Sequence, residues 1–385
     1  MRIDIVFPRL PPVLDGIGDH TACLAETLAA QACTPRVLTA QSDWRPLSGV
    51  AVEKAFHRDD RRGVLRLVDA VSAHPPDWLL LQFEQFSYGR WGLNPFLPLA
   101  IYRIRRKAPA TRIAILFHED YMPATGPASA VMSAWQQPQF RVLGHLADIA
   151  FFSTEQRAKT YAGSFNGTDI RHLPVGSNMP TVSADRLRQR SALGIADNTV
   201  VLGVFGSAHP SRLLSHVRAA VTACRRESTN VDVLYIGPDG DDVRSVLGAE
   251  ADVLDAGPLA PEEVSRHFCA MDLYLAPFRD GVSSRRGSFL TGLQHGVATA
   301  TTRGPETGPS LARQHGTAFV APPRDRRDLF VHQVTRLASS PALRTTLGEQ
   351  GHALYDRRYA WPHVARRLRT ALRRSARAAR AGSCS

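Results

Sequence analysis

The sequence predicts an α/β fold made of two Rossmann-like domains that face one another across a cleft. Short apolar runs bounded by polar residues recur along the chain, as buried parallel strands do, and amphipathic segments of helical period separate them. A polar, turn-rich segment at 176–183 divides two such series. A chain of 385 residues is also longer than one hydrophobic core usually supports, which favours two domains.

The first domain is expected at residues 1–178. Helices are expected from near His20, over 62–73 and over 98–106, and the charge-rich remainder of 42–77 interrupts the alternation. The predicted strands are 2–7, 36–39, 78–83, 112–117, 147–153 and 171–174.

Two glycines, Gly16 and Gly18, lie between the first predicted strand and its helix. Their G-x-G spacing is typical of dinucleotide-binding turns, although Ala22 occupies the place of the third glycine. Glycines at this point let a ligand approach the backbone, and a tight turn without a ligand is the alternative.

His118, Glu119 and Asp120 directly follow the strand predicted at 112–117. The carboxyl ends of strands are where open α/β sheets bind their ligands, so three ionisable groups there indicate a site. We predict a functional role for His118. A structural histidine held by hydrogen bonds is the alternative.

The second domain is expected at 185–360, and it repeats the alternation of strands and helices. Helices are expected over 261–270, 329–339 and 341–357, with a further one around Phe289 that ends before Gly296. The predicted strands are 199–205, 231–236, 253–254, 271–278, 297–302 and 319–320.

The loop between the strand at 271–278 and the next helix has the composition of an anion site. It carries Arg285 and Arg286 together with two serines, and it leads into a helix N-terminus. Backbone N–H groups and the helix dipole favour a phosphate at such a place, and a guanidinium can add a bidentate hydrogen bond. A solvated basic loop is the alternative reading.

The net charge of +12 is concentrated near the C-terminus. Seven arginines and no acidic residue lie between His363 and Arg380. This tail could contact an anionic membrane, but apolar residues at helical spacing favour a helix packed on the body of the protein. No basic face rich in aromatic residues and no helix-turn-helix pattern accompanies it, so we expect no nucleic-acid partner.

The five cysteines are scattered and form no C-x-x-C pair, which argues against both a disulfide framework and a zinc site. The sequence contains no run of eighteen apolar residues, so we expect no membrane span. The first apolar run is too short for the core of a signal peptide. We therefore expect a cytoplasmic protein without a metal.

Four features in this order resemble the retaining GT-B glycosyltransferases of the bacterial family-four group, along nearly the whole chain. They are the loop from Gly16 to His20, the H-E-D triplet at 118–120, the L-P-V-G-S-N run at 173–178, and the strand, loop and helix at 271–296 followed by G-V-A-T-A-T-T. The resemblance implies that the first domain binds an acceptor and the second a nucleotide diphosphate sugar. It also implies that a final helix at 361–385 returns to the first domain.

The chain departs from the family pattern at the expected donor contacts. Ser207 stands where the family has an arginine, and Arg212 lies near the place of its lysine. The family's two glutamates, spaced eight apart, correspond to Asp280 and to either Ser288 or Thr291. The second glutamate normally holds the nucleotide ribose, so the ribose contacts differ here. We expect the two adjacent arginines of the loop to replace part of the missing phosphate grip.

The function implied is transfer of a sugar, with retention, from a nucleotide diphosphate donor to the hydroxyl or amine of a small molecule or glycan. A UDP-sugar is favoured over a GDP-sugar, with no further cofactor. Arg212, Arg285 and Arg286 would stabilise the diphosphate, His118 would hydrogen-bond the donor sugar, and Asp280 is the second candidate catalytic residue. The remaining candidate donor contacts are Gly16, Gly18, Ser207, Ser288 and Thr291.

Two other functions fit the same fold. A sugar-nucleotide epimerase would need more acid and base residues than the sequence offers in the cleft. A nucleotide-sugar-binding protein with weakened catalysis could have kept the fold without the glutamates.

Overall fold

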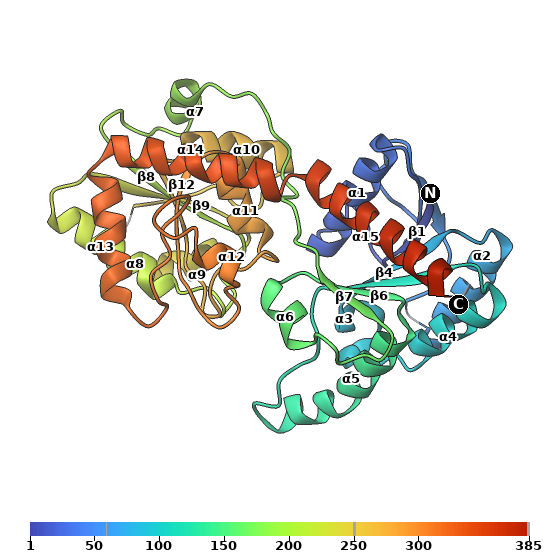
Figure 1. The fold of residues 1–385 in the computed structure, drawn as a ribbon. Helices are drawn as coiled ribbons and strands as arrows, with labels where there is room; N and C mark the ends of the chain where they lie inside the picture. The colour runs from blue at the N-terminus through green and yellow to red at the C-terminus, as the bar shows by residue number, and fades with distance from the viewer. Residues whose placement is uncertain (59, 249–251, 383–385) are drawn as a thin grey trace. The chain divides into compact units, whose positions relative to one another are not determined.

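The computed structural model describes residues 1–58, 60–248 and 252–382, with the side chains of Arg61 and of residues beyond 376 left aside (Figure 1). It consists of two compact α/β units. Unit 1 combines Met1–Pro174 with the segment from Trp361 onward, and unit 2 is Val175–Ala360. The division falls slightly before the end expected for the first domain at 178, because Val175 already donates its backbone N–H to Ser284 of unit 2.

Unit 1 contains a parallel sheet of seven strands in the order β3-β2-β1-β4-β5-β6-β7. The strands are β1 (Arg2–Val6), β2 (Thr34–Thr39), β3 (Ala51–Lys54), β4 (Trp78–Phe83), β5 (Arg112–Phe117), β6 (Ile149–Phe152) and β7 (Asp169–His172). The α-helices are α1 (Gly16–Ala30), α2 (Leu67–Ala73), α3 (Gln85–Tyr88), α4 (Phe96–Lys107), α5 (Pro127–Leu146), α6 (Glu155–Thr160) and α15 (Trp361–Gly382).

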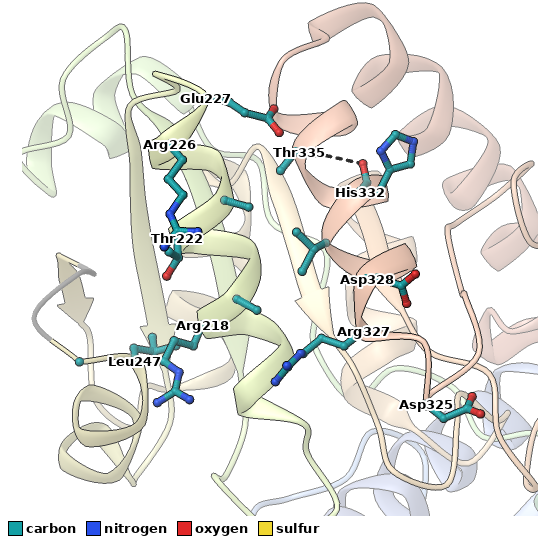
Figure 2. Close-up of a pocket in the computed structure, with 14 residues that line it drawn as sticks. Arg218, Thr222, Arg226, Glu227, Leu247, Asp325, Arg327, Asp328, His332 and Thr335 are labelled. Carbon is teal, nitrogen blue, oxygen red and sulfur yellow. Dashed lines mark hydrogen bonds between the residues drawn. The ribbon is translucent and has the colours of Figure 1, made fainter.

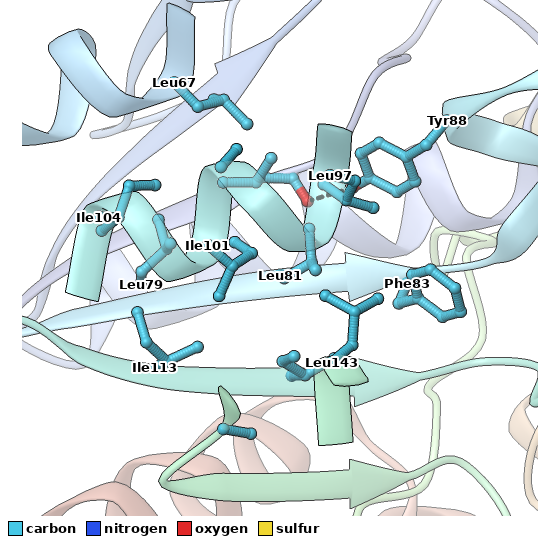
Figure 3. Close-up of a cluster of buried hydrophobic side chains, with 14 of the residues drawn as sticks. Leu67, Leu79, Leu81, Phe83, Tyr88, Leu97, Ile101, Ile104, Ile113 and Leu143 are labelled. Atoms are coloured by element: carbon cyan, nitrogen blue, oxygen red, sulfur yellow. Dashed lines mark hydrogen bonds between the residues drawn. The ribbon is translucent and has the colours of Figure 1, made fainter. Parts of the chain in front are cut away.

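Two hydrophobic layers cover the faces of this sheet. On one face, Leu79 and Leu81 of β4 and Ile113 of β5 pack against Leu97 and Ile101 of α4 (Figure 3). On the other face lie the apolar sides of α1 and α15. Every second residue of a strand points to the same face, and an all-apolar strand such as β4 therefore supplies both layers.

The C-terminal arginine-rich segment is a packed helix, as its apolar spacing predicted. Its buried residues all join the layer formed with α1, and they are Val364, Ala365, Leu368, Ala371 and Leu372. No helix among the described residues is long and apolar enough to cross a bilayer.

Unit 2 contains a second parallel sheet of five strands in the order β10-β9-β8-β11-β12. The strands are β8 (Val200–Phe205), β9 (Val231–Ile236), β10 (Val253–Asp255), β11 (Leu273–Ala276) and β12 (Ala298–Thr301). The helices are α7 (Arg186–Ala192), α8 (Leu214–Arg226), α9 (Gly240–Leu247), α10 (Pro261–Ala270), α11 (Gly287–Gln294), α12 (Pro309–Ala312), α13 (Arg327–Ala338) and α14 (Pro341–Arg358).

The α/β class with two Rossmann-like parallel sheets is thus confirmed, and several elements differ from expectation. Segment 42–77 holds the edge strand β3 and begins its helical part as a 3₁₀ turn (Arg61–Arg66) before α2. Helix α5 was not predicted. The strand expected at 319–320 is wrong, since Phe319 and Val320 form only isolated bridges.

The strand orders place the loops that matter for function. In each sheet the order reverses at one point, between β1 and β4 in unit 1 and between β8 and β11 in unit 2. Ligands of open α/β sheets bind at the carboxyl ends of strands beside such a reversal.

Candidate functional site

The loops that follow β8 and β11 meet at the carboxyl edge of the sheet of unit 2. Arg212 and Phe278 form an antiparallel bridge between them. On either side of it, Leu213 N–H donates to Pro277 O at 3.0 Å, and Arg279 N–H donates to Ser211 O at 2.7 Å. Strands β8 and β11 are neighbours in the sheet, and these hydrogen bonds hold the loops that follow them against one another.

Arg212 folds back over the end of β8. Its Nη2 donates to the carbonyl of Phe205 and lies 3.4 Å from Ser288 Oγ. A Cβ at Gly206 would lie 2.7 Å from that nitrogen, and Gly206 has φ +99°, so only glycine suits the position. Nη1 of Arg212 is buried and has no hydrogen-bond partner within the described part of the chain.

Arg286 lies beside Arg212, on the same aromatic ring. Its guanidinium carbon is 4.6 Å from the centroid of Phe278, and that of Arg212 is 5.4 Å from it. Nη2 of Arg286 is 3.6 Å from a carboxylate oxygen of Asp280. Burial, together with the positive charges of Arg285 and Arg212, lowers the pKa of Arg286 to about 10, and the carboxylate of Asp280 opposes this shift.

Arg285 completes a cluster of three guanidinium groups. Burial lowers its pKa, and the nearby carboxylate of Glu306 opposes that shift. Three positive groups are therefore gathered at this point, and the carboxylates of Asp280 and Glu306 act on them. Like charges held together in a poorly solvated place are stabilised by an anion.

Helix α11 begins at this cluster. Its N-cap residue is Arg286, which makes no side-chain capping bond, and its first turn contains no acidic residue. The first backbone N–H groups and the positive end of the helix dipole are therefore offered to an anion. Ser283 adds a buried Oγ that has no hydrogen-bond partner among the described residues.

The other donor contacts expected in unit 2 divide into two kinds. Ser288 reaches the cluster through Arg212, and Ser207 is exposed in the loop after β8. Thr291 is buried, and its hydroxyl is 3.0 Å from both Gly287 O and Ser177 Oγ. Those bonds tie α11 to the start of unit 2. Of the two alternatives for the second glutamate position, Ser288 is thus the one that contacts the arginine cluster.

The glycines of unit 1 do not lie in a loop, and the predicted helix start near His20 is wrong. Helix α1 begins at Gly16 because Asp15 caps it, its carboxylate accepting the N–H groups of Ile17 at 2.9 Å and Gly18 at 3.0 Å. A Cβ at Gly18 would lie 2.9 Å from Arg9 O, so this glycine permits close packing of backbone on backbone. A Cβ at Gly16 would meet no atom within 4 Å.

His118 is buried at the carboxyl end of β5. Its Nε2 lies 2.7 Å from Gln82 Oε1, and since an amide oxygen can only accept, this nitrogen carries the proton and donates it to the hydrogen bond. Its ring packs edge-on against His20 at 5.1 Å. Burial, with a smaller effect of His20, holds the pKa of His118 well below its usual value. The imidazole is neutral, and one of its nitrogens already has a structural partner.

The two acidic residues after His118 have partners in and beside α6. Glu119 pairs with Arg157 at 2.7 Å, and Asp120 accepts a hydrogen bond from Tyr161 at 2.9 Å. Sequence reasoning missed the partners Gln82 and His20. The polar Gln82 within the apolar strand β4 was the available signal for the first of them.

A groove of about 1190 Å³ lies elsewhere in unit 2, between α8 and α13 (Figure 2). Arg218 and Arg226 stand on its α8 side, and Asp328 and His332 on its α13 side. None of the predicted site residues lines it. No group of three His, Cys, Asp or Glu side chains in the described ranges could hold a metal ion.

No family model matches the chain, and no curated protein sequence matches it. Solved structures match its fold over almost its whole length. Sucrose-phosphate synthase from Thermosynechococcus elongatus aligns with a TM-score of 0.73 and 14% identity, over 98% of this chain and 100% of that chain. Anabaena HepE, in complex with UDP and glucose, aligns with a TM-score of 0.68 and 13% identity, over 97% of this chain and 99% of that chain.

A protein of Listeria monocytogenes described as a UDP-N-acetylglucosamine 2-epimerase aligns with a TM-score of 0.61 and 12% identity, over 96% of this chain and 95% of that chain. At these identities the likeness concerns the fold. The chain has the two-domain GT-B fold that glycosyltransferases share with such epimerases.

Proposed function

We propose that the protein is a glycosyltransferase that moves a sugar from a nucleotide diphosphate donor to an acceptor hydroxyl or amine. One observation carries this proposal, namely the cluster of Arg212, Arg285 and Arg286 at the N-terminus of α11. Its charge, its depth and its place at the strand-order reversal suit a diphosphate.

The diphosphate of the donor is proposed to bind through residues of unit 2. The free Nη1 of Arg212 and the first N–H groups of α11 would hydrogen-bond the diphosphate, and Ser288 would replace the family's ribose-binding glutamate. A UDP-sugar is the favoured donor. The HepE structure, which contains UDP and glucose on this fold, supports that choice.

The chemistry follows from the positive cluster. The bond between the sugar C1 and the diphosphate oxygen breaks while the acceptor oxygen or nitrogen bonds to C1 on the same face, and a diphosphate oxygen takes the acceptor proton. The arginines neutralise charge that grows on the leaving group, which lowers the barrier. Asp280, through its ion pair with Arg286, would position that guanidinium.

The proposed acceptor is a small molecule or glycan, and the proposed location is the cytoplasm. Cys23, Cys33, Cys224 and Cys269 are free thiols, in keeping with a reducing compartment. Cys384 lies outside the described residues. His118 stays the proposed contact of the donor sugar, through Nδ1, since Gln82 holds Nε2.

A donor panel tests the proposal. The purified protein is titrated by calorimetry with UDP-, GDP- and ADP-glucose, and each donor that binds is incubated with an acceptor library and analysed by mass spectrometry. Binding of a nucleotide sugar and a glycosylated product support the transferase. Conversion of the nucleotide sugar without any acceptor indicates the epimerase, and binding without turnover indicates a binding protein. No binding of any nucleotide sugar contradicts all three.

A further inference from the structure

A second cationic site lies on unit 1, along the outer side of α15. The arginines of this helix do not all have the same role. Arg369 donates to Gln31 O at 2.5 Å, and Arg367 donates to His172 O at 3.3 Å. Both of these arginines tie the helix to the domain.

Three further arginines of α15 are not neutralised. Arg366, Arg373 and Arg374 are exposed, and none has an acidic partner in the portion of the chain that the structure describes. Since α15 contains no Asp or Glu, their charges add along one side of the helix. Such a run of positive charge creates a potential that attracts polyanions.

A cavity of about 310 Å³ gives this surface a defined binding point. It lies between α15 and the edge strand β7. Arg366, Arg367 and Arg374 line it from the helix, and Arg171 lines it from the strand, with Thr370 between them. Asp169 offsets only part of that charge, through its 2.6 Å pair with Arg171.

His172, a half-buried residue that also lines this cavity, responds to the positive charge of the arginines. Burial and, to a smaller extent, the charge of Arg367 lower the pKa of His172 to about 4, and the carboxylate of Glu155 opposes this shift. The imidazole is therefore neutral at physiological pH, and the positive charge of the cavity comes from its guanidinium groups.

We propose that this cavity binds the phosphate of an anionic phospholipid, and that the exposed arginines of α15 hold unit 1 on a membrane surface. Guanidinium groups form bidentate hydrogen bonds with phosphate oxygens, and clusters of basic side chains bind acidic lipid surfaces. This site and the proposed donor site are formed by different residues, since α15 and β7 belong to unit 1, whereas Arg212, Arg285 and Arg286 belong to unit 2. It does not depend on the proposed transfer reaction.

Two features favour a bilayer over a nucleic acid. At a rise of about 1.5 Å per residue, α15 is a rod of roughly 33 Å, long enough to lay several arginines on a plane of head groups. The exposed side chains between Arg366 and Arg374 are arginines and a threonine, without the aromatic rings on which bases stack.

The test uses the full chain and sedimentation with vesicles. We expect binding to phosphatidylglycerol-containing vesicles and none to pure phosphatidylcholine. The double variant Arg366→Gln/Arg374→Gln should weaken binding by about 25-fold, at roughly fivefold for each basic residue near an acidic surface. The matched control Arg218→Gln/Arg226→Gln removes the same charge from α8, in unit 2, and should change binding less than twofold.

Four results would contradict the proposal that the cavity binds a phospholipid. Equal losses in the two double variants would show a nonspecific effect of net charge, and binding to neutral vesicles would exclude head-group recognition. Displacement from vesicles by millimolar glycerol 3-phosphate would identify a site for soluble phosphates. Tighter binding to a single-stranded oligonucleotide, lost in the α15 variant, would identify a nucleic-acid surface. An unchanged Tm and circular dichroism spectrum confirm that each variant is folded, so that this outcome does not depend on binding of a nucleotide sugar.

Discussion

The guanidinium group of Arg286 lies over the ring of Phe278, 4.6 Å from its centroid. Arg212 comes from a different loop and lies at 5.4 Å from the same ring. A ring face attracts cations, and one aromatic side chain thus holds two mutually repelling charges side by side. In the protein without a ligand, the repulsion between the two guanidinium groups raises the free energy of the folded state. A bound diphosphate would relieve that repulsion.

Replacing Arg286 by alanine should weaken donor binding. A charge-assisted hydrogen bond contributes about 1.5 to 3 kcal/mol, which corresponds to a donor Kd raised roughly tenfold or more. Calorimetric titration with the preferred nucleotide sugar measures it. Arg279→Ala is the matched control, since Arg279 is an exposed arginine of the same loop. Equal effects of the two variants would assign the loss to general charge and remove Arg286 from the site.

Gly206→Ala should affect the donor site through Arg212. The substitution combines a positive φ, which costs about 1 kcal/mol for a residue with a Cβ, with crowding of Arg212 Nη2. Gly316→Ala has a similar φ of +80° and meets no atom within 4 Å, so it carries the backbone strain alone. Both variants should lose similar stability in urea titrations, and only Gly206→Ala should lose donor affinity. A normal donor Kd in Gly206→Ala would mean that Arg212 need not occupy its present position.

His20 should make unit 1 sensitive to acid. Burial lowers its pKa to about 3, and neither ring nitrogen has a partner among the described residues. The unfolded chain binds a proton at His20 below about pH 6.5 and the folded chain does not, so stability falls as the pH drops from 6.5 towards 3. At pH 5 the loss from this residue is about 2 kcal/mol.

The comparison with His20→Leu isolates this contribution. Burial raises the pKa of the neighbouring Asp19 to about 6, which works in the opposite direction in both proteins and cancels in the difference. The free energy of unfolding, measured between pH 7 and 5, should fall less in the variant than in the parent protein by that amount. Parallel pH profiles would show that His20 is protonated in the folded state.

Truncation should separate the packed part of α15 from its end. Val364, Leu368 and Leu372 are completely buried in the layer shared with α1, and a chain that ends at Ala360 should therefore fail to fold or be inactive. A chain that ends at Arg374 keeps that apolar face and should retain transfer activity. Thermal melting and product formation check both. An active protein ending at Ala360 would mean that unit 1 is stable without α15.

Two central strands of unit 1 could be predicted to the residue, and its edge strand β3 could not be predicted at all. The predicted runs 78–83 and 112–117 coincide with β4 and β5, because a strand buried on both faces must be apolar throughout. Strand β3 is largely exposed at the sheet edge and has no such run. Helix α5 contains Pro138 and several glutamines, which obscured its helical pattern.

The sequence could predict which loop forms the candidate site, but it could not predict which side chains contact one another there. The composition of 280–288 indicated anion binding, because arginines, serines and a helix N-terminus coincide there in sequence. The role of Phe278 was hidden, since an aromatic residue at the end of a strand reads as core. The pairing of His118 with Gln82 depends on β4 and β5 being neighbours, which is a property of strand order and not of spacing along the chain.

That pairing also decides how His118 should be tested. Since His118 is buried and bonded to Gln82, removing its ring destabilises the fold as well as any catalysis, and activity alone cannot distinguish the two roles. Gln82→Ala is the matched control, because it removes the same hydrogen bond from the other side. The bond contributes about 0.5 to 1.5 kcal/mol to stability, so both variants should show a lower Tm.

The two roles then predict different kinetics. If His118 hydrogen-bonds the donor sugar in the transition state, His118→Ala should lower the turnover number by roughly tenfold to a thousandfold, whereas Gln82→Ala should lower it only severalfold. Turnover is measured with saturating donor well below the Tm of each variant, so that both are folded. Turnover that falls equally in both variants, in step with their Tm, would make His118 a structural histidine and leave the arginine cluster of unit 2 as the catalytic machinery.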